Sequence, residues 1–552
     1  MTDILLIQPP VRDFYITAKR TIPYGLACIA SSLDRQGFSV DILDGSATSR
    51  SRVIDLPPEM ACLDACYGRA DVSPFGLFHH YRHFGAGFEH LGKKAKESGA
   101  FLVGVSSLFT AYADEALTTA EAVKRFHPGC IVVLGGHHPT HLPEKVLECP
   151  AVDYVLRGEG EQSMPELARA LKEKSDLRNV PGIAFRGPSG RSIVNPPAAV
   201  PDLDRQPLPA FRLLNRRFYR RNGRGSGVVT ASRGCPMRCS YCSMGGSSGI
   251  TYRKRSVESV LAEMEELVYT FGTGFIDFED ENISLDRRWF LCLLDGINER
   301  FAAADLELRA MNGLFPPTLD DEIIRRMKEA GFTALNLSLA STCLEQLARF
   351  RRPDVRISFK NALRCARRLG MHAVGYIIVG APHQAAFDSL ADLLYLAGLP
   401  VIAGVSVYYP SPGSADFSLC SDAGLLPEKT SLLRSTVFPI SHTTTREESI
   451  TLLRLGRILN FIKSLPPLRQ PRSLPVDPVP CSTDGMKAIE RLASDARTPT
   501  ARRNIGMILL AWFLHDCRVR GVTPDGEVYE HRVSEPLCRM FVQAVLRSGV
   551  VR

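Results

Sequence analysis

Residues 231–246 read ASRGCPMRCSYCSMGG and place Cys235, Cys239 and Cys242 in the spacing Cys-x3-Cys-x2-Cys. Spacers this short hold three sulfurs in one tight loop. Three thiolates ligate three irons of a cubane iron–sulfur cluster and leave the fourth iron without a protein ligand. A substrate binds readily at such an open metal position. The stretch therefore predicts a 4Fe-4S cluster with these three cysteines as metal ligands and catalytic centre.

A structural zinc site is the alternative use of a cysteine cluster. Zinc prefers four closed ligands, and the loop contains no fourth cysteine. The first histidine on the C-terminal side is His372, far along the chain. The zinc interpretation is therefore disfavoured.

The cysteine stretch resembles the signature of the radical S-adenosylmethionine (radical SAM) superfamily, including an aromatic residue, Tyr241, directly before the third cysteine. The resemblance implies that the open iron chelates the amino and carboxylate groups of SAM. One electron from the cluster then cleaves the sulfonium to a 5′-deoxyadenosyl radical. It also implies an anaerobic enzyme, a contact between Tyr241 and SAM, and an electron donor such as flavodoxin or ferredoxin.

Length and composition bound the remaining possibilities. A chain of 552 residues predicts about three domains, and 45% hydrophobic with 23% charged residues is ordinary for a globular protein. No apolar run reaches the ~18 residues of a membrane span. The N-terminus lacks the basic region and cleavage site of a signal peptide, which predicts a cytoplasmic protein with reduced thiols among its fifteen cysteines. The net charge of +8 comes from arginine clusters without interleaved aromatics, so no nucleic-acid partner is expected.

Residues 1–170 predict an α/β domain with a doubly wound, flavodoxin-like parallel sheet, because apolar runs alternate with helical segments. Strands are expected at 4–8, 38–44, 101–107, 131–136 and 152–157, with helices that include 24–36 and 113–125. Ligands of such sheets bind outside the carboxyl ends of the strands.

The run GGHHPTHLPEKVL, followed by VDYVLRGEGE, resembles the cobalamin-binding (B12-binding) domain at the N-terminus of one class of radical SAM enzymes. The opening QPP and PYGLACIASSLDRQGFSVDILD fit the same class. The alternative is another flavodoxin-like coenzyme domain, although no G-x-G-x-x-G follows the first strand. The resemblance implies that cobalamin contacts residues at the strand ends, namely Pro9, Pro10, Ser106, Ser107, Gly135, Gly136, His137, Thr140, Gly158 and Glu159.

The histidine motif of methionine synthase-like cobalamin domains, Asp-x-His-x-x-Gly, does not occur in the sequence. The resemblance therefore implies cobalamin bound without a cobalt ligand from that motif. His137, His138 and His141 follow the fourth strand, and at most one or two of them are expected to touch the corrin.

Residues 227–424 predict a second series of six strand–helix units after a proline-rich linker at 171–226. With the cysteines after its first strand, the series fits the (β/α)6 partial TIM barrel of the radical SAM fold. Its strands are expected at 228–232, 275–279, 307–311, 334–340, 373–379 and 404–409. In such barrels the active residues gather at the carboxyl ends of the strands.

The ends of these strands supply the candidate SAM-binding residues. Many relatives have Gly-x-Glu-Ser after the fourth strand, whereas this chain has Ala340 in place of the glutamate. The resemblance implies SAM contacts from Asp280, Glu281, Ser338, Ser341, Gly380 and Pro382, in addition to Tyr241.

Two further regions have no cofactor motif. Residues 425–552 predict a mostly helical region that caps the open side of the barrel. Within an insertion at about 45–100, aromatic residues recur at three- and four-residue steps and predict the apolar face of a helix that packs on the sheet. These aromatic residues are Phe75, Phe78, Tyr81, Phe84 and Phe88. A wall of the cofactor or substrate pocket is the alternative.

Both resemblances together predict a methyltransferase that acts on an unactivated carbon of a small-molecule or natural-product substrate. The substrate radical would take a methyl group from methylcobalamin. A radical cyclase or rearrangement enzyme with the same cofactors is the first alternative, and a non-catalytic corrinoid carrier or sensor is the second. No motif in the sequence names the substrate.

Overall fold

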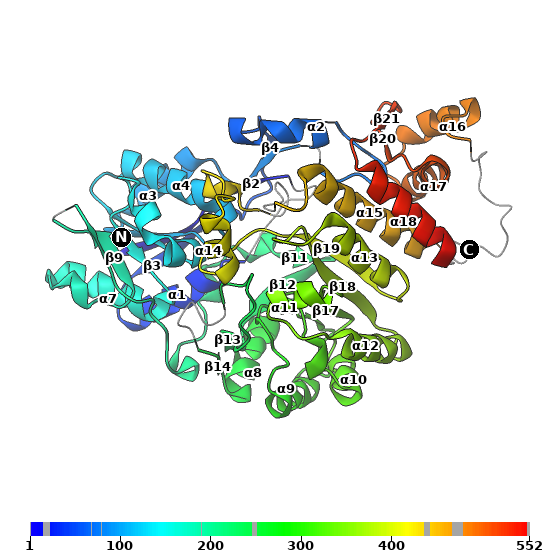
Figure 1. Cartoon of the computed structure of the whole chain (residues 1–552). Helices are drawn as coiled ribbons and strands as arrows, with labels where there is room; N and C mark the ends of the chain where they lie inside the picture. Colours follow the sequence, from blue (N-terminus) through cyan, green and yellow to red (C-terminus); the bar gives the residue numbers. More distant parts are fainter. Residues whose placement is uncertain are drawn as a thin grey trace.

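A seven-stranded sheet forms the N-terminal part of the chain (Figure 1). The structure is a computed structural model that describes residues 2–14, 22–67, 69–78, 80–188, 190–244, 251–434, 442–465 and 479–548. Five parallel strands run in the order β3-β1-β6-β7-β8. They are β1 (Ile4–Gln8), β3 (Val40–Asp44), β6 (Leu102–Ser106), β7 (Ile131–Gly135) and β8 (Tyr154–Leu156). The predicted doubly wound sheet is confirmed.

Helices cover both faces of this sheet because successive strand residues point to opposite sides. In β1, Ile4 and Leu6 pack in the core that includes α1, whereas Leu5 and Ile7 pack in the core that includes α3 and α4. The helices are α1 (Tyr24–Arg35) and α7 (Gly160–Glu173) on one face, and α3 (Phe88–Ser98) and α4 (Ala113–Phe126) on the other.

The segment predicted as a linker begins with two further strands of the same sheet. Strands β9 (Ile183–Arg186) and β10 (Ser192–Val194) pair antiparallel with β8 and with each other. Only the part after β10 is a connection, and it runs along α1, where Ala210 N–H donates to Ala27 O over 3.0 Å. The sequence predicts a short strand at 182–186 within the linker, and β9 confirms it, whereas β10 was not predicted. The domain boundaries at 170, 226 and 424 stay predictions.

Six parallel strands form the predicted partial barrel, which is confirmed. They are β12 (Arg224–Val229), β15 (Thr273–Phe278), β16 (Glu307–Arg309), β17 (Ala334–Ala340), β18 (His372–Val379) and β19 (Ile402–Val407). Bridges at Leu308–Phe332 and Leu314–Leu337 join the two halves. The outer helices are α8 (Val257–Glu265), α9 (Arg287–Arg300), α10 (Asp321–Glu329), α12 (Arg356–Arg368) and α13 (Ala386–Ala397).

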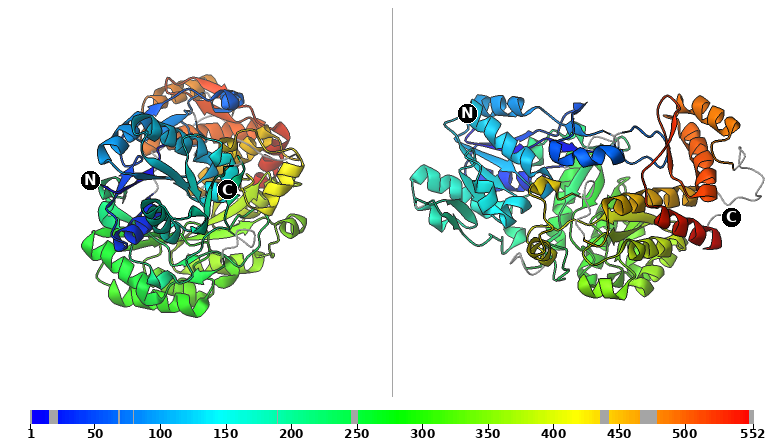
Figure 2. Two further views of the ribbon diagram at one scale, coloured as in Figure 1. Left: turned by 90° about the vertical axis from the view of Figure 1, so that its left-hand side faces the viewer. Right: turned by 45° about the horizontal axis from the view of Figure 1, so that its top comes forward.

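The C-terminal region is mostly helical, as predicted. Its elements are α15 (Arg446–Ser464), α16 (Thr483–Ala493), α17 (Pro499–Asp516), α18 (Glu535–Ser548) and a hairpin of β20 (Arg520–Val522) and β21 (Val528–Glu530). Helix α15 packs against β19 and α13. The hairpin contacts the insertion of the N-terminal part, where His531 Nε2 lies 2.9 Å from Asp71 Oδ2 and Val72 N–H donates to Val522 O (Figure 2).

The helix predicted for the aromatic run at 75–88 is wrong. Residues Arg82–Phe84 form strand β5, which pairs with β2 (Val11–Asp13) and β4 (Ser51–Val53). Phe75 instead packs edge-on against Phe461 of α15. The helical spacing arose by coincidence, because separate elements each bury an aromatic side chain.

Among the described residues, no helix is long and apolar enough to cross a membrane.

The turn into β9 offers a test of the extended sheet. Gly182 has φ +70, and a Cβ there would lie 2.3 Å from Arg157 O of β8's carboxyl end. Gly190 has φ +77 but open space around its Cβ position. We expect Gly190→Ala to cost about 1 kcal/mol of unfolding free energy from backbone strain alone, and Gly182→Ala to cost about 1–3 kcal/mol more from the clash. Thermal unfolding of both variants measures the difference, and equal losses would contradict the placement of β9.

Candidate functional site

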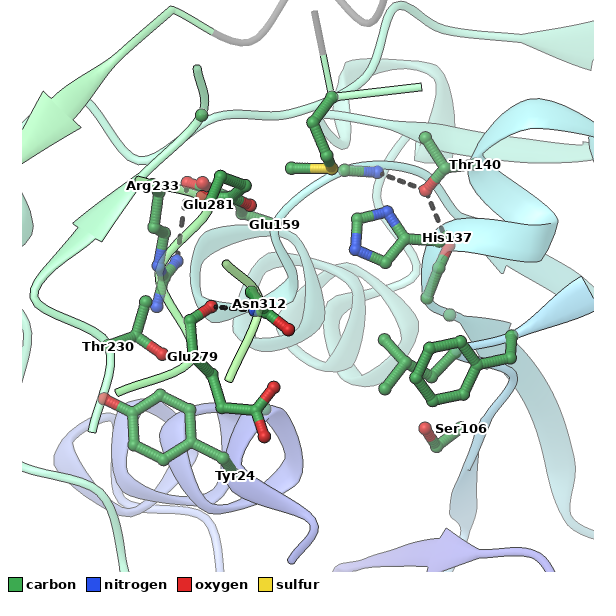
Figure 3. Close-up of a pocket in the computed structure, with 18 of the residues that line it drawn as sticks. Tyr24, Ser106, His137, Thr140, Glu159, Thr230, Arg233, Glu279, Glu281 and Asn312 are labelled. Atoms are coloured by element: carbon green, nitrogen blue, oxygen red, sulfur yellow. Dashed lines mark hydrogen bonds and ion pairs between the residues drawn. The ribbon is translucent and has the colours of Figure 1, made fainter. Parts of the chain in front are cut away.

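One cavity of about 760 Å³ lies between the N-terminal sheet and the mouth of the barrel (Figure 3). The carboxyl ends of both sets of strands open into it. Figure 3 shows His137, Thr140 and Ser106 on one side of this space and Arg233, Glu281, Glu279 and Asn312 on the other. The two predicted cofactor regions therefore share one cavity.

Most of the predicted site residues line this cavity. From the barrel side they are Cys235, Cys239, Tyr241, Cys242, Glu281 and Ser338, and from the sheet side Ser106, Gly135, Gly136, His137, Thr140, Gly158 and Glu159. The remaining predicted residues do not line it, namely Pro9, Pro10, Ser107, Asp280, Ser341, Gly380 and Pro382.

The cysteine loop leaves the barrel at β13 (Ser232–Arg233) and returns at β14 (Arg253–Lys254). Burial raises the pKa of Cys235 and raises that of Cys242 to about 11, and the neighbouring thiols add to both shifts. Thiolates therefore form here when a metal compensates their charge. In the described part of the chain, no three His, Cys, Asp or Glu side chains converge tightly enough to ligate a single ion. A cubane spreads its ligands over separate irons, and three thiols on one cavity wall fit that requirement.

Asp280 and Glu281 were both expected to contact SAM, but the structure gives them different roles. Asp280 is buried and accepts hydrogen bonds from Ala231 N–H (3.1 Å) and Ser232 Oγ (2.6 Å), so it anchors the start of the cysteine loop. Glu281 points into the cavity, and its buried Oε2 has no hydrogen-bond partner among the described residues. Burial raises the pKa of Glu281 to about 7. An orphaned acceptor of this kind fits the cationic amino group of SAM.

Of the residues predicted at the ends of the fourth and fifth strands, only Ser338 lines the cavity. Ala340 has φ +66 in a bulge, which turns the following Ser341 into the protein. Ser341 Oγ donates to the buried Asp392 Oδ2 over 2.7 Å. Gly380 lies behind the wall, with its N–H directed to Ser389 Oγ. Ile378, two residues earlier on β18, lines the cavity instead.

Arg352 is a cavity residue that sequence reasoning missed. Its Nη1 lies 3.8 Å from Cys239 Sγ, its Nη2 donates to Ser338 Oγ over 3.2 Å, and its guanidinium lies 5.1 Å from the Phe315 ring centre. The arginine run that contains it gave no signal that one member turns inward. A guanidinium beside a cluster thiolate stabilises negative charge on the cluster.

On the sheet side, small residues leave room for a bulky ligand. Gly136 has φ +122, and a Cβ there would lie 2.5 Å from Ser107 O. In the middle of β6, Gly104 opens an apolar slot that leads from the strand ends toward α1 and α7. The slot is lined by Leu6, Ile29, Val133, Leu156 and Met164. A Cβ on Gly104 would fill it, at 2.8 Å from Leu6 Cδ2. This shape fits a corrinoid.

His137 projects into the sheet side of the cavity (Figure 3). Its side chain is exposed to the cavity while the protein surrounds it, and this burial lowers its pKa. The imidazole is therefore neutral at pH 7. His141 also lines the cavity, whereas His138 is buried with its Nδ1 3.3 Å from Thr110 Oγ1.

Two of the predicted cobalamin residues have structural partners. Thr140 Oγ1 donates to Gly136 O (2.7 Å) and accepts from Gly158 N–H (2.9 Å), so it fixes both glycine loops. Ser107 packs inward, and its N–H donates to Gly135 O. The chain turns away from the cavity at Pro9 and Pro10, and Gln8 lines it in their place.

Glu159 lines the cavity but is part of an ion-pair network that joins the sheet to the cysteine loop. Arg253 holds both of its oxygens at 2.6 and 2.9 Å, and Arg233 lies 3.6 Å from Glu159 and 2.5 Å from Glu161. Burial alone would raise the pKa of Glu159, but Arg253 and Arg233 outweigh it and lower the pKa. We call Glu159, Glu161, Arg233 and Arg253 the ion-pair clamp. Sequence reasoning missed its two arginines and Glu161, because the pairing is between distant segments.

Comparison with known proteins identifies both halves of the cavity. Residues 78–168 match the B12 binding domain family, and residues 229–393 match the radical SAM superfamily. The chain contains a B12-binding domain and a radical SAM domain. Its cofactors are a 4Fe-4S cluster, SAM and cobalamin, and the residues around the cavity fit them.

Relatives of this chain include several methyltransferases. An uncharacterized methyltransferase of Pyrococcus horikoshii is 28% identical over 74% of this chain and 81% of its own length. Cytidylyl-2-hydroxyethylphosphonate methyltransferase of Streptomyces wedmorensis is 25% identical over 78% and 84%. The solved structure of the radical SAM methyltransferase TsrM from Kitasatospora setae, with cobalamin and a [4Fe-4S] cluster bound, shares the fold. Its TM-score is 0.58 at 19% identity, over 77% of this chain and 76% of TsrM.

Removing the central arginine of the ion-pair clamp tests how firmly the two domains are joined. We expect Arg233→Met to lower the unfolding free energy by about 3–5 kcal/mol, because Glu161 is left buried without its cation. Arg212→Met is the control, since Arg212 pairs with Asp34 at an exposed site, with side chains 53% and 57% exposed, and such pairs contribute about 0–1 kcal/mol. Denaturant unfolding measures both. A loss for Arg233→Met no larger than the control's would contradict the clamp.

Arg352 gives a second test at the site. We expect Arg352→Ala to lower the midpoint potential of the reconstituted cluster by on the order of 50 mV, because a hydrogen bond and a positive charge beside a thiolate favour the reduced state. Arg352→Lys keeps the charge and should recover part of the shift. EPR-monitored redox titration without SAM measures it, with the exposed Arg364→Ala as control. An unchanged midpoint potential in Arg352→Ala would contradict the contact between Arg352 and Cys239.

Proposed function

We propose that this protein is a cobalamin-dependent radical SAM methyltransferase that methylates an unactivated carbon of a small molecule. One observation carries the proposal: the three cysteines and the strand ends of the B12-binding domain line the same cavity. A methyl group and a substrate radical must meet without release of either, and a shared cavity allows that.

When bound, the cluster and SAM supply a carbon-centred radical, and cobalamin supplies the methyl group. The chain's own residues bind, orient and shield these groups. Glu281 accepts a hydrogen bond from the amino group of SAM, and Ser338 and Tyr241 line the same side of the cavity. On the opposite side, the corrinoid contacts the neutral His137 and the end of β7 at Gly135 and Gly136, where no side chain projects. Leu108 and Phe109 add an apolar wall that excludes water from the reacting groups.

The alternatives have weaker support. Relatives named as anaerobic magnesium-protoporphyrin IX monomethyl ester cyclases match over a smaller share, for example 59% of this chain and 54% of the protein of Cereibacter sphaeroides. The matches to the methyltransferases of Pyrococcus horikoshii and Streptomyces wedmorensis span about four fifths of those relatives. A non-catalytic corrinoid carrier has no need of a radical SAM domain with a complete cysteine triad.

The cellular setting is part of the proposal. All fifteen cysteines are free thiols, which suits a reducing, cytoplasmic environment. Such an environment supplies the low-potential electron donor that the cluster requires, such as flavodoxin or ferredoxin.

Product analysis separates methylation from the other radical reactions without knowledge of the substrate. A methyltransferase of this type consumes SAM in two ways and releases both 5′-deoxyadenosine and S-adenosylhomocysteine. We expect reduced, reconstituted enzyme with methyl-labelled SAM to form S-adenosylhomocysteine only when cobalamin is present. Cys239→Ala should lose bound iron and 5′-deoxyadenosine formation.

The contrary outcome is equally specific. If 5′-deoxyadenosine forms but S-adenosylhomocysteine never does, with or without cell extract as a source of substrate, the methyltransferase assignment fails. The cyclase or rearrangement function then takes its place.

A further inference from the structure

We propose that an acidic one-electron carrier protein docks on a basic surface directly outside the cysteine loop. This surface, which we call the arginine face, consists of Arg238, Arg349 and Arg351. The inference rests on the proposed function, because only a redox-active cluster needs a carrier, but its test is chosen to succeed or fail separately.

At this point a single segment of the cysteine loop separates the cavity from the outer surface. Cys235, Met237 and Cys239 line the cavity, whereas the alternate residues Pro236 and Arg238 are exposed. One side of the loop therefore holds the cluster ligands, and the other side presents Arg238 to the outer surface.

The second half of the arginine face is fixed against this loop by main-chain contacts. Ser240 N–H donates to Phe350 O over 3.1 Å, and the Phe350 ring packs edge-on against Tyr241 at 5.0 Å. Helix α11 (Leu344–Arg349) ends directly before Phe350. Its last residue, Arg349, is exposed beside the loop.

The backbone at the end of α11 sorts the arginines into an inner and an outer set. Arg351 has φ +53, a left-handed conformation that non-glycine residues seldom adopt. On its two sides, Phe350 packs inward and Arg352 reaches Cys239, while Arg351 itself is exposed. The strained residue Arg351 is thus exposed to solvent, while its neighbour Arg352 points to Cys239.

The positive charge of the arginine face is not neutralised within the described parts of the chain. Arg238 and Arg351 form no ion pair there. Arg349 donates to His383 O over 3.0 Å, and its carboxylate partner in those parts is Glu345 at 3.9 Å, with 83% of that side chain exposed. The nearby Asp354 is already paired with Arg356 at 2.6 Å. The nearby Asp416 is buried, and its backbone N–H donates to Ser240 O. Burial raises the pKa of Asp416 although the charge of Arg351 acts to lower it, so this carboxyl offsets the positive charge only in part. An uncompensated positive surface attracts and orients a negatively charged protein.

Position and charge together point to an electron carrier rather than another acidic partner. A carrier docked on the arginine face faces the cluster ligands across the thickness of a single loop. In the transfer the carrier is oxidised by one electron and the cluster is reduced by one, with no bond formed or broken. Such encounters use small, transient, charge-steered interfaces.

Reduction kinetics test the proposal with two kinds of reductant. The reconstituted full-length enzyme is assayed for 5′-deoxyadenosine formation with a bacterial flavodoxin hydroquinone, and separately with dithionite, which needs no docking surface. We expect Arg238→Glu and Arg351→Glu each to raise the KM for flavodoxin about tenfold, because a like charge opposes docking. The dithionite-driven rate and the bound iron should stay at the wild-type level. Arg288→Glu, an exposed position on α9, is the matched control.

Direct binding keeps the test independent of turnover. Titration of oxidised flavodoxin, followed by its flavin fluorescence, should give the same order of affinities and weaken as salt is raised. An unchanged flavodoxin KM and affinity in both variants would overturn the docking surface. An equal loss with dithionite would do so too, because it would place the arginines inside the catalytic machinery. Wild-type enzyme that binds flavodoxin but forms no 5′-deoxyadenosine with either reductant would instead count against the proposed function.

Discussion

Arg233, at the start of the cysteine loop, contacts the B12-binding domain directly and pairs with Glu161 and Glu159. Buried ion pairs of this kind contribute little net stability but require a strict geometry, because each charge is costly without its partner. The strand that leads into the cysteines is thereby fixed to the loop that follows β8. Since Arg253 holds the same loop, both ends of the cysteine hairpin are tied to the sheet. The separation of the two cofactor regions follows from these contacts more than from either domain alone.

The sequence was informative wherever function depends on short-range spacing. The spacing of the three cysteines predicted a cluster-binding loop. Apolar runs that alternate with helical segments predicted both sheets, because burial imposes a local period on strands and helices. The carboxyl ends of the strands then indicated the cavity. At Gly135, Gly136 and His137 this reasoning led directly to residues that line it.

Roles that depend on side-chain direction were not predictable. Asp280 and Glu281 are neighbours with the same charge, and only the backbone at the end of β15 decides that one anchors Ala231 while the other faces the cavity. Arg352 lies in a run of similar arginines, and its selection depends on the left-handed residue before it. The aromatic run that begins at Phe75 gave a wrong helix prediction, because its aromatic residues belong to separate elements and show a helical spacing only by coincidence. In each case the deciding contact comes from a segment far away in the chain.

The contact between Asp71 and His531 spans 460 positions of the chain. At about 5–20 residues per second, the ribosome needs roughly 20 to 90 s to make the second partner after the first. During that interval the insertion of the B12-binding domain lacks the surface that buries Asp71. The nascent chain thus passes through a period in which its first domain is largely synthesised yet incomplete, and chaperones or the corrinoid itself can reach it before the C-terminal hairpin closes over it.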